Sequence, residues 1–367
     1  MANSPDRVRV RLPDLSPRAY EHPADRGALV ALRSLSGFDV LVKSLFGRVS
    51  ERQLRLLFLA NAVRVGPTQF PELHDYLRDA AYVLDLDDVP ELYVKMDPTP
   101  NAMAIGRKKP FIVMTTGLFD LFDAEEKRFV IGHEVGHILS GHAVYRTLLL
   151  LLVWIAQKIM WIPLGALAIQ AILVALKEWH RKSELSADRA GLLACQNPDA
   201  AKRALMKLAG GSNLSEMNPD AFMEQAREYE AGGDAVDSVL KLMSTVPASH
   251  PFAVVRVAEM QRWLESGEYE RILGGEYPRR TQDSESRVSE EAGRAADSYR
   301  EDWNRTKDPL VSVVRDVAGG AAGAGGRIFD SVAERWRGGG RPGNGGENGS
   351  DGGDAGDNGG GNSSDRP

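Results

Sequence analysis

Cysteine is almost absent from this chain, since Cys195 is the only one among 367 residues. A single cysteine excludes an internal disulfide framework and every zinc site that is built from cysteine pairs. Any metal must therefore be held by histidine and carboxylate side chains. An excess of positive charge is also lacking, because the net charge is -6 at pH 7. This charge balance argues against a nucleic-acid partner.

The beginning of the sequence lacks the apolar segment of a secretory signal. The run MANSPDRVRVRLPDLSPRAY mixes charged and polar residues throughout. We therefore expect a cytoplasmic protein. With 43% hydrophobic and 26% charged residues, the chain can bury a substantial core, and its length fits one large domain or two smaller ones.

Four regions are expected along the chain, and together they predict an α+β, mainly helical fold. Residues 1–60 carry apolar side chains at helical spacing and predict a helical N-terminal region. Residues 61–265 form the expected main domain, in which the β-like runs ELYVKM and PFIVMTT predict a small sheet. Residues 266–337 predict a polar, partly helical extension. The tail, 338–367, is rich in Gly, Asn, Asp and Ser and predicts disorder.

The run HEVGH, from His133 to His137, matches the pattern H-E-x-x-H. A helix is predicted there, because Asp123 and Glu126 have the spacing of a capping box before the run. Residues four apart lie on one face of a helix, so both imidazoles can bind one Zn²⁺ with Glu134 beside them. For the motif alone, the alternative is a surface helix that carries two unrelated histidines.

A catalytic zinc needs a third protein ligand and an open position for water. Glu184 is the best candidate, in the run HRKSELSADRAG on a separate predicted helix. Asp188 follows one turn later on the same face, where its carboxylate can accept the outer N–H of a zinc-bound imidazole. The alternative for Asp188 is an exposed carboxylate that is paired with Arg181 or Arg189.

Taken together, HEVGHILSGH, SELSADRAG, the earlier PNAMA and the later SHPFAVVR resemble a known family. This family is the gluzincin-type zinc metallopeptidases typified by the heat-shock protease HtpX and the CAAX prenyl protease, peptidase family M48. The resemblance covers roughly residues 60–265. It implies a zincin-like metallopeptidase domain over the main region, with one Zn²⁺ per chain.

The resemblance also implies a role for each residue of the motifs. His133, His137 and Glu184 would be the zinc ligands. Glu134 would be the general base that takes a proton from water and passes it to the leaving amine. Asp188 would support a ligand histidine from behind.

By the same resemblance, the substrate is an extended polypeptide that pairs with the edge of the sheet. The edge strand would be formed by Asn101, Ala102, Met103 and Ala104. The family more often has Phe where this chain has Met103, which changes the shape of a subsite and leaves backbone pairing unaffected.

Further histidines and one arginine are candidates for other roles. The resemblance suggests that His250, in an HP motif, or Arg256 stabilises the oxyanion. A structural salt bridge is the alternative for Arg256. His142 extends the motif, yet it stands five residues after His137 and would point to a different face of a continuous helix, so we interpret it as structural. His180 could approach the metal or be a solvated or helix-capping histidine.

The longest apolar run, 147–176, has the hydropathy of a membrane span, with one charge and a central proline. One full crossing would put His137 and Glu184 on opposite sides of the bilayer, which a shared metal forbids. We therefore predict a short helical hairpin that contacts the membrane or packs against protein. Tyr145 and Trp179, at its two ends, should face the same compartment.

These observations predict a zinc metalloendopeptidase, and the resemblance adds a role in membrane protein quality control. The expected location is the cytoplasm, with the inner face of the plasma membrane as the place of any membrane contact through 147–176. The alternative is a zinc-stabilised, chaperone-like protein that binds peptides without cleaving them. A fourth protein ligand such as His180 or His250 would favour this alternative, whereas an open position would favour catalysis.

Overall fold

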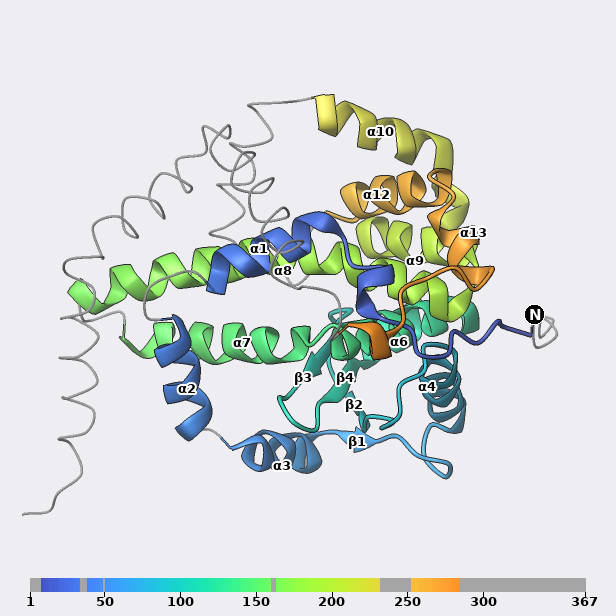
Figure 1. The fold of residues 1–367 in the computed structure, drawn as a ribbon. Helices are drawn as coiled ribbons and strands as arrows, with labels where there is room; N and C mark the ends of the chain where they lie inside the picture. Colours follow the sequence, from blue (N-terminus) through green and yellow to red (C-terminus); the bar gives the residue numbers. More distant parts are fainter. Residues whose placement is uncertain (1–7, 34–37, 49, 160–162, 232–251, 284–367) are drawn as a thin grey trace, which may run out of the picture.

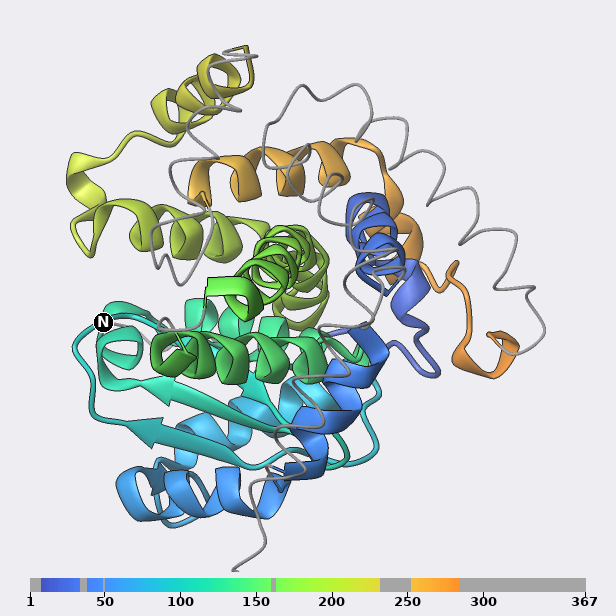
Figure 2. The same ribbon diagram turned by 90° about the vertical axis from the view of Figure 1, so that its left-hand side faces the viewer.

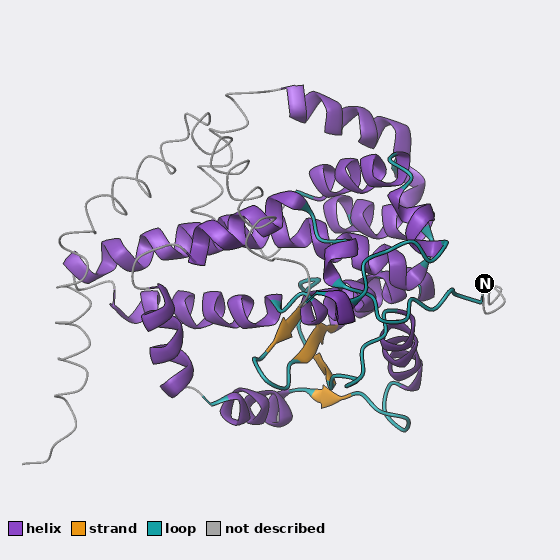
Figure 3. Cartoon of the chain, in the orientation of Figure 1, coloured by secondary structure: helices purple, strands orange, loops and turns teal. Residues whose placement is uncertain are grey.

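The computed structural model describes residues 8–33, 38–48, 50–159, 163–231 and 252–283 (Figure 1). Helices dominate this part of the chain and surround one small sheet (Figure 3). The sheet contains β1 (Val63–Arg64), β2 (Leu92–Lys95), β3 (Ala102–Ile105) and β4 (Phe111–Thr115) in the order β1-β2-β4-β3. The β2–β4 pair is parallel, and the β1–β2 and β3–β4 pairs are antiparallel. This mixed sheet confirms the α+β class, and its strands β2 and β4 lie in the two β-like runs.

Alternating side chains give the sheet two buried faces, as the pleat of a strand requires. One face carries Tyr93, Ile105, Phe111 and Val113, which pack against Leu54 and Phe58 of α3 (Glu51–Asn61). The opposite face belongs to the main core, and its side chains are Leu92, Val94, Ala102, Ala104, Ile112 and Met114. Figure 2 shows α3 below the sheet and the green helices above it. The sheet is therefore a middle layer.

Short helices form the described N-terminal part of the chain. They are η1 (Pro17–Ala19), α1 (Pro23–Arg33), α2 (Phe38–Arg48), α3 and α4 (Pro71–Val83). Leu12, Leu15 and Tyr20 are buried in the same core as the sheet, so the first described residues contribute directly to that core. The α1 helix packs along α8 (Pro163–Cys195), beside the middle of the molecule (Figure 1).

Two helices meet at the centre of the molecule, α6 (Ala124–Leu139) and α8 (Pro163–Cys195). The α6 helix follows α5 (Thr116–Leu121), and its N-cap is Asp123, whose side chain accepts a hydrogen bond from the Glu126 backbone N–H. The Glu126 side chain bonds back to the Asp123 N–H, which completes the predicted capping box.

Small residues let α6 and α8 approach closely. A Cβ atom on Gly132 would lie 2.3 Å from Cβ of Ala194, and one on Gly136 would lie 2.3 Å from Cβ of Ala190. Neither separation is possible between real side-chain atoms, so only glycine permits this spacing. The close packing brings the face of α6 that carries HEVGH against the face of α8 that carries Glu184.

The remaining helices follow α8 in the chain. They are α9 (Pro198–Gly210), η2 (Leu214–Glu216), α10 (Pro219–Ala231), α12 (Ala253–Glu265), α13 (Glu268–Leu273) and η3 (Arg280–Gln282). Among them α9 and α12 pack against α8 and against each other. Tyr269 and Ile272 of α13 are buried in the main core, so the described beginning of the polar extension packs on the main domain. The predicted disordered tail, 338–367, is not among the described residues.

The apolar run lies on α7 (His142–Ile159) and on α8, with residues 160–162 not described between them. Leu148, Leu152, Ile172 and Leu176 are buried together with side chains of α1 and α2. The rings of Tyr145 and Trp179 lie 5.2 Å apart, so the side chains that flank the two ends of the run are in contact. The helical hairpin itself stays a prediction. Within the described ranges no single helix has the length and apolarity of a membrane span. One pair passes that test together, Ala124–Leu139 with His142–Trp154, bent by 92°.

Candidate active site

Three buried side chains from α6 and α8 converge on one point. Nε2 of His137 lies 3.1 Å from Nε2 of His133. Oε2 of Glu184 lies 3.4 Å from Nε2 of His133, and Oε1 of Glu184 lies 3.3 Å from Nε2 of His137. Among the described residues this is the group of histidine and carboxylate side chains whose ligand atoms are close enough to share a metal ion. The sequence-predicted ligands are thus brought together.

His133 is held from behind by a carboxylate and an arginine. Its Nδ1 lies 3.0 Å from Oδ1 of Asp188. Asp188 is therefore on the side of the ring opposite to the Nε2 atom that takes part in the three-residue group. Arg256, on α12, donates to both oxygens of Asp188 at 2.7 and 2.6 Å, and its Nη1 lies 3.4 Å from Oε2 of Glu184. The predicted contact of Asp188 with a ligand histidine is present. Arg256 forms the salt bridge that the sequence analysis gave as the alternative for it. The oxyanion role of Arg256 stays a prediction.

The two histidines differ in their affinity for a proton. Burial lowers the pKa of His133, but the carboxylates of Glu184 and Asp188 outweigh burial and raise the pKa of His133 to about 9. Burial and the charge of Arg146 lower the pKa of His137 well below its usual value. In the metal-free protein His133 therefore carries a proton at neutral pH and His137 does not. A metal ion held by His133 would have to displace this proton.

His137 has a different partner behind it. The α6 helix ends at Leu139, and Gly141 has a φ of +70°, a conformation that glycine adopts without the steric cost of a side chain. The chain then turns into α7, so Nδ1 of His142 lies 3.0 Å from Nδ1 of His137. The prediction that His142 points to a different face was wrong, because it assumed one continuous helix. Nε2 of His142 in turn lies 3.1 Å from Oδ2 of Asp25.

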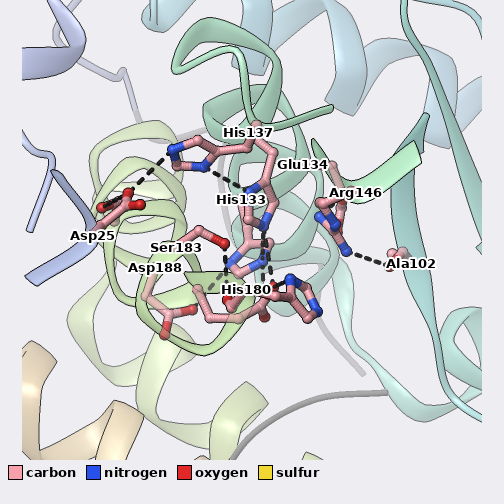
Figure 4. A network of polar contacts seen from close by, with 12 residues as sticks. Asp25, Ala102, His133, Glu134, His137, Arg146, His180, Ser183 and Asp188 are labelled. Carbon is pink, nitrogen blue, oxygen red and sulfur yellow. Dashed lines mark hydrogen bonds and ion pairs between the residues drawn. The ribbon is translucent and has the colours of Figure 1, made fainter. Parts of the chain in front are cut away.

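Glu134 is also buried, and it has an ion-pair partner that sequence reasoning missed. Nη1 of Arg146 donates to Oε2 of Glu134 at 3.0 Å. Nη2 of the same side chain donates to the carbonyl oxygen of Ala102 at 3.4 Å. Arg146 therefore connects the carboxylate beside the metal-binding group with strand β3, and Figure 4 shows it between Glu134 and Ala102.

The predicted substrate strand is at the edge of the sheet, in β3. Asn101, just before it, accepts a hydrogen bond from the Thr115 N–H at 2.9 Å. Hydrogen bonding alternates along an antiparallel pair, so the backbone N–H and C=O groups of Met103 also point toward β4. The backbone N–H and C=O groups of Ala102 and Ala104 point to the side away from β4. The strand thus has backbone groups that are not used within the sheet.

Two other predicted candidates have different outcomes. His250 falls in 232–251, a range that the structure does not describe. Nδ1 of His180 lies 3.7 Å from Oε1 of Glu184, but His180 is not a member of the three-residue group. Asp25 and Arg146 were missed, because no local spacing links either one to the HEVGH run.

Comparisons with known proteins agree with this geometry. A family model described as "Peptidase family M48" matches residues 67–264. The chain is 35% identical over 283 residues to "Plastoglobule-localized metallopeptidase 48, chloroplastic" of Arabidopsis thaliana, covering 73% of this chain and 81% of the relative. It is 28% identical over 238 residues to a "Protease HtpX homolog" of Thermodesulfovibrio yellowstonii, covering 56% of this chain and 80% of that relative. No solved structure matches.

The matched range contains the HEVGH run, Glu184, the edge strand and nearly all of α12. The extent of the family match and the similarity to the plastoglobule relative, together with the three-residue group, identify the family. The chain belongs to peptidase family M48 and is a metalloprotease.

Proposed function

We propose that the protein is a zinc-dependent endopeptidase with His133, His137 and Glu184 as the metal ligands. The observation that carries the proposal is the spacing of their ligand atoms. Zinc bonds of about 2.0–2.1 Å at tetrahedral angles would place such atoms roughly 3.3–3.4 Å apart. The separations here are 3.1, 3.3 and 3.4 Å. A group of three protein ligands leaves the fourth position open, which is typical of catalytic zinc and unlike a closed structural site.

Glu134 is the proposed general base. Bound zinc would supply Lewis-acid chemistry, acidifying water and polarising a peptide carbonyl. The Glu134 carboxylate takes the proton of the attacking water and transfers it to the leaving amine. Arg146 holds one carboxylate oxygen at 3.0 Å, which fixes the orientation of Glu134 beside the ligands. Asp188 orients His133, and Arg256 holds Asp188 ionised in its buried position.

The proposed substrate is an extended polypeptide that adds a strand to β3. Ala102 and Ala104 offer the backbone groups for pairing, and Asn101 and Met103 flank them along the strand. Arg146 donates a hydrogen bond to the carbonyl oxygen of Ala102, so an incoming strand would pair at a group that Arg146 also contacts. Backbone pairing recognises an extended conformation and has little dependence on sequence.

We also propose that the metalloprotease works at a membrane or lipid surface, on its cytoplasmic side, in the quality control of membrane proteins. Leu150, Val153 and Trp154 belong to the apolar run and are exposed on α7, and Trp154 is 59% exposed. The name of the Arabidopsis relative refers to plastoglobules. Exposed apolar side chains of this kind bind lipid surfaces in other proteins.

Metal analysis and peptidase assays test the site directly. The purified chain should hold about one zinc ion, and replacing both His133 and His137 by Ala should abolish binding. Glu134→Gln should retain zinc and lose peptide hydrolysis, because it removes the base and keeps the ligands. Wild-type zinc content in the double histidine variant would overturn the ligand assignment. Full turnover in Glu134→Gln would overturn the assignment of the base. If zinc-bound wild-type protein bound peptides without cleaving them, the chaperone-like alternative would be favoured.

A further inference from the structure

Asp25 is a buried carboxylate near the metal-binding group, and it comes from a segment that the family match does not include. It is 1% exposed and lies in the first turn of α1, whereas the match begins at residue 67. Its Oδ2 lies 3.1 Å from Nε2 of His142 and accepts a hydrogen bond of 2.6 Å from the Ser186 hydroxyl. Figure 4 shows Asp25 on one side of the histidines and Arg146 on the other. A carboxylate so deeply buried needs such partners, because burying a charge without them is costly.

The positions of Asp25, His142 and His137 determine which ring nitrogens carry protons. A carboxylate oxygen only accepts, so Nε2 of His142 carries the proton that it donates to Asp25. The two Nδ1 atoms of His142 and His137 face each other at 3.0 Å, so one must donate and the other accept. If Nδ1 of His142 accepts, Nδ1 of His137 carries a proton and its Nε2 is left with a lone pair. That Nε2 is the atom that points at His133 and Glu184.

The position of Asp25 is fixed by the packing of the N-terminal segment on α8. The hydroxyl of Ser186 accepts from the His22 backbone N–H at 2.9 Å and donates to Asp25, so one α8 side chain ties down the start of α1. Ser186 is itself fully buried, between Glu184 and Asp188 in sequence. The carboxylate is therefore held by the fold, independently of any metal.

We propose that Asp25 is a positioning residue for the metal ligand His137 and acts through His142. Asp25 sets the tautomer and the orientation of His142, and His142 does the same for His137. The helix α1 is thereby part of the metal site, although it lies outside the matched family region. The two ligand histidines are supported in different ways, His133 by Asp188 directly and His137 by a carboxylate one ring further away. This inference rests on the proposed function only in taking His137 as a zinc ligand.

Zinc affinity of the full-length chain tests the proposal. Asp25→Leu removes the acceptor at similar volume, and it should weaken zinc binding about 10- to 100-fold in competition with a chromophoric chelator, as loss of such supporting partners does elsewhere. Asp25→Asn retains an acceptor oxygen without the charge, and it should give a smaller loss. Tyr20→Phe is the matched control. It removes a partly buried polar contact between the same segment and the C-cap of α6, where Ser140 donates to Tyr20 at 3.1 Å, and it should leave zinc affinity unchanged.

A spectroscopic measurement separates positioning from a general loss of structure. Two-bond ¹H–¹⁵N spectra of the histidine-labelled, zinc-loaded protein should show His142 with its proton on Nε2 and His137 with its proton on Nδ1. In Asp25→Asn, or in Asp25→Leu if that variant folds, the His142 signal should lose this single tautomer. An Nδ1-protonated His142 in the wild-type protein would overturn the proposal.

The outcomes of the affinity measurement are distinguishable from failure of the proposed function. If the wild-type chain binds no zinc, or if binding does not need His137, the metal site itself is wrong. If the wild type binds zinc through His137 and both Asp25 variants bind it equally well, the metal site stands and the role of Asp25 is refuted. An equal loss in Tyr20→Phe and Asp25→Leu would also refute it, because the effect would then be a general one of the N-terminal segment.

Discussion

The two halves of α8 make an instructive comparison within one helix. In the outer half, residues 163–179, the buried side chains Ile172, Leu176 and Trp179 pack with α1, α2 and α7 in an apolar cluster. In the inner half, residues 180–195, four polar side chains are buried, and glycine and alanine face α6. The buried polar residues there are Ser183, Glu184, Ser186 and Asp188.

The difference shows how one continuous helix combines two kinds of packing. The outer half needs side chains that are apolar and of suitable volume, and such cores tolerate exchange among hydrophobic residues. The inner half must place each carboxylate opposite one partner and must let α6 approach at a distance that only glycine allows. Substitutions of similar size should therefore have unequal effects in the two halves, and the following predictions test this inequality.

The largest effect is expected where a buried charge of the inner half loses its partner. Arg256→Leu leaves Asp188 and Glu184 without their buried guanidinium, which should lower the free energy of unfolding by about 3–5 kcal/mol. The matched control is Arg262→Leu on the same helix, where the side chain is 51% exposed. That variant should stay within about 0.5 kcal/mol of wild type. Urea denaturation of metal-free protein measures both, and equal stability of the two variants would contradict a structural role for the Arg256 salt bridge.

The next effect is expected from adding one methyl group between α6 and the inner half. The Cβ added by Gly136→Ala would clash with Cβ of Ala190, and overpacking of this kind costs about 1–3 kcal/mol. The shift should also move His137, so zinc affinity should fall. Gly47→Ala in α2 is the control, because no atom lies within 4 Å of the added Cβ. Its stability should be unchanged or higher by up to about 1 kcal/mol, since alanine favours helix. If thermal melting and zinc titration ranked the two variants in the opposite order, the close packing of α6 and α8 would not be the cause.

A smaller effect is expected from removing one methyl group in the outer half. Ile172→Val leaves a small void in the apolar cluster and should cost about 0.5–1.5 kcal/mol. Zinc affinity of the folded protein should not change, because the cluster contains none of the proposed ligands. Chelator competition and urea denaturation on the same sample separate the two quantities. A fall in zinc affinity as large as that of Gly136→Ala would show that the two halves are not independent.

The smallest effect is expected in thiol labelling of Cys195, the last residue of α8. Burial raises the pKa of its thiol to about 12, and the side chain is fully buried. The reactive thiolate is therefore scarce at pH 7 to 10, and a thiol reagent should not label the native protein anywhere in that range. In urea the pKa returns to about 8.5, so labelling should become rapid at pH 9. Lys182→Cys in a Cys195→Ser background is the control and should react in the native state. Rapid native labelling of Cys195 would mean that the end of the inner half opens readily.

Several features of the fold and site were predictable because they depend on local spacing. The capping box at Asp123, the helix that carries HEVGH and the strands around ELYVKM and PFIVMTT lie where the pattern places them. Glu184 and Asp188 are one helical turn apart, so if one reaches the metal-binding group the other reaches the ring of His133. The prediction that His142 points away from His137 was wrong, because it extended the helix past Gly141, where the chain turns.

The sequence by itself determined the family, the helical metal-binding run and the need for a third metal ligand, because residues within one helix have a fixed geometry. Only the tertiary structure decided which distant side chains stand behind them. Asp25 reaches His142 because α1 packs on α8, and Arg146 reaches Glu134 and Ala102 because the chain bends at Gly141 between α6 and α7. Such contacts depend on how helices pack, and neither the periodicity of one helix nor the composition of the chain contains that information.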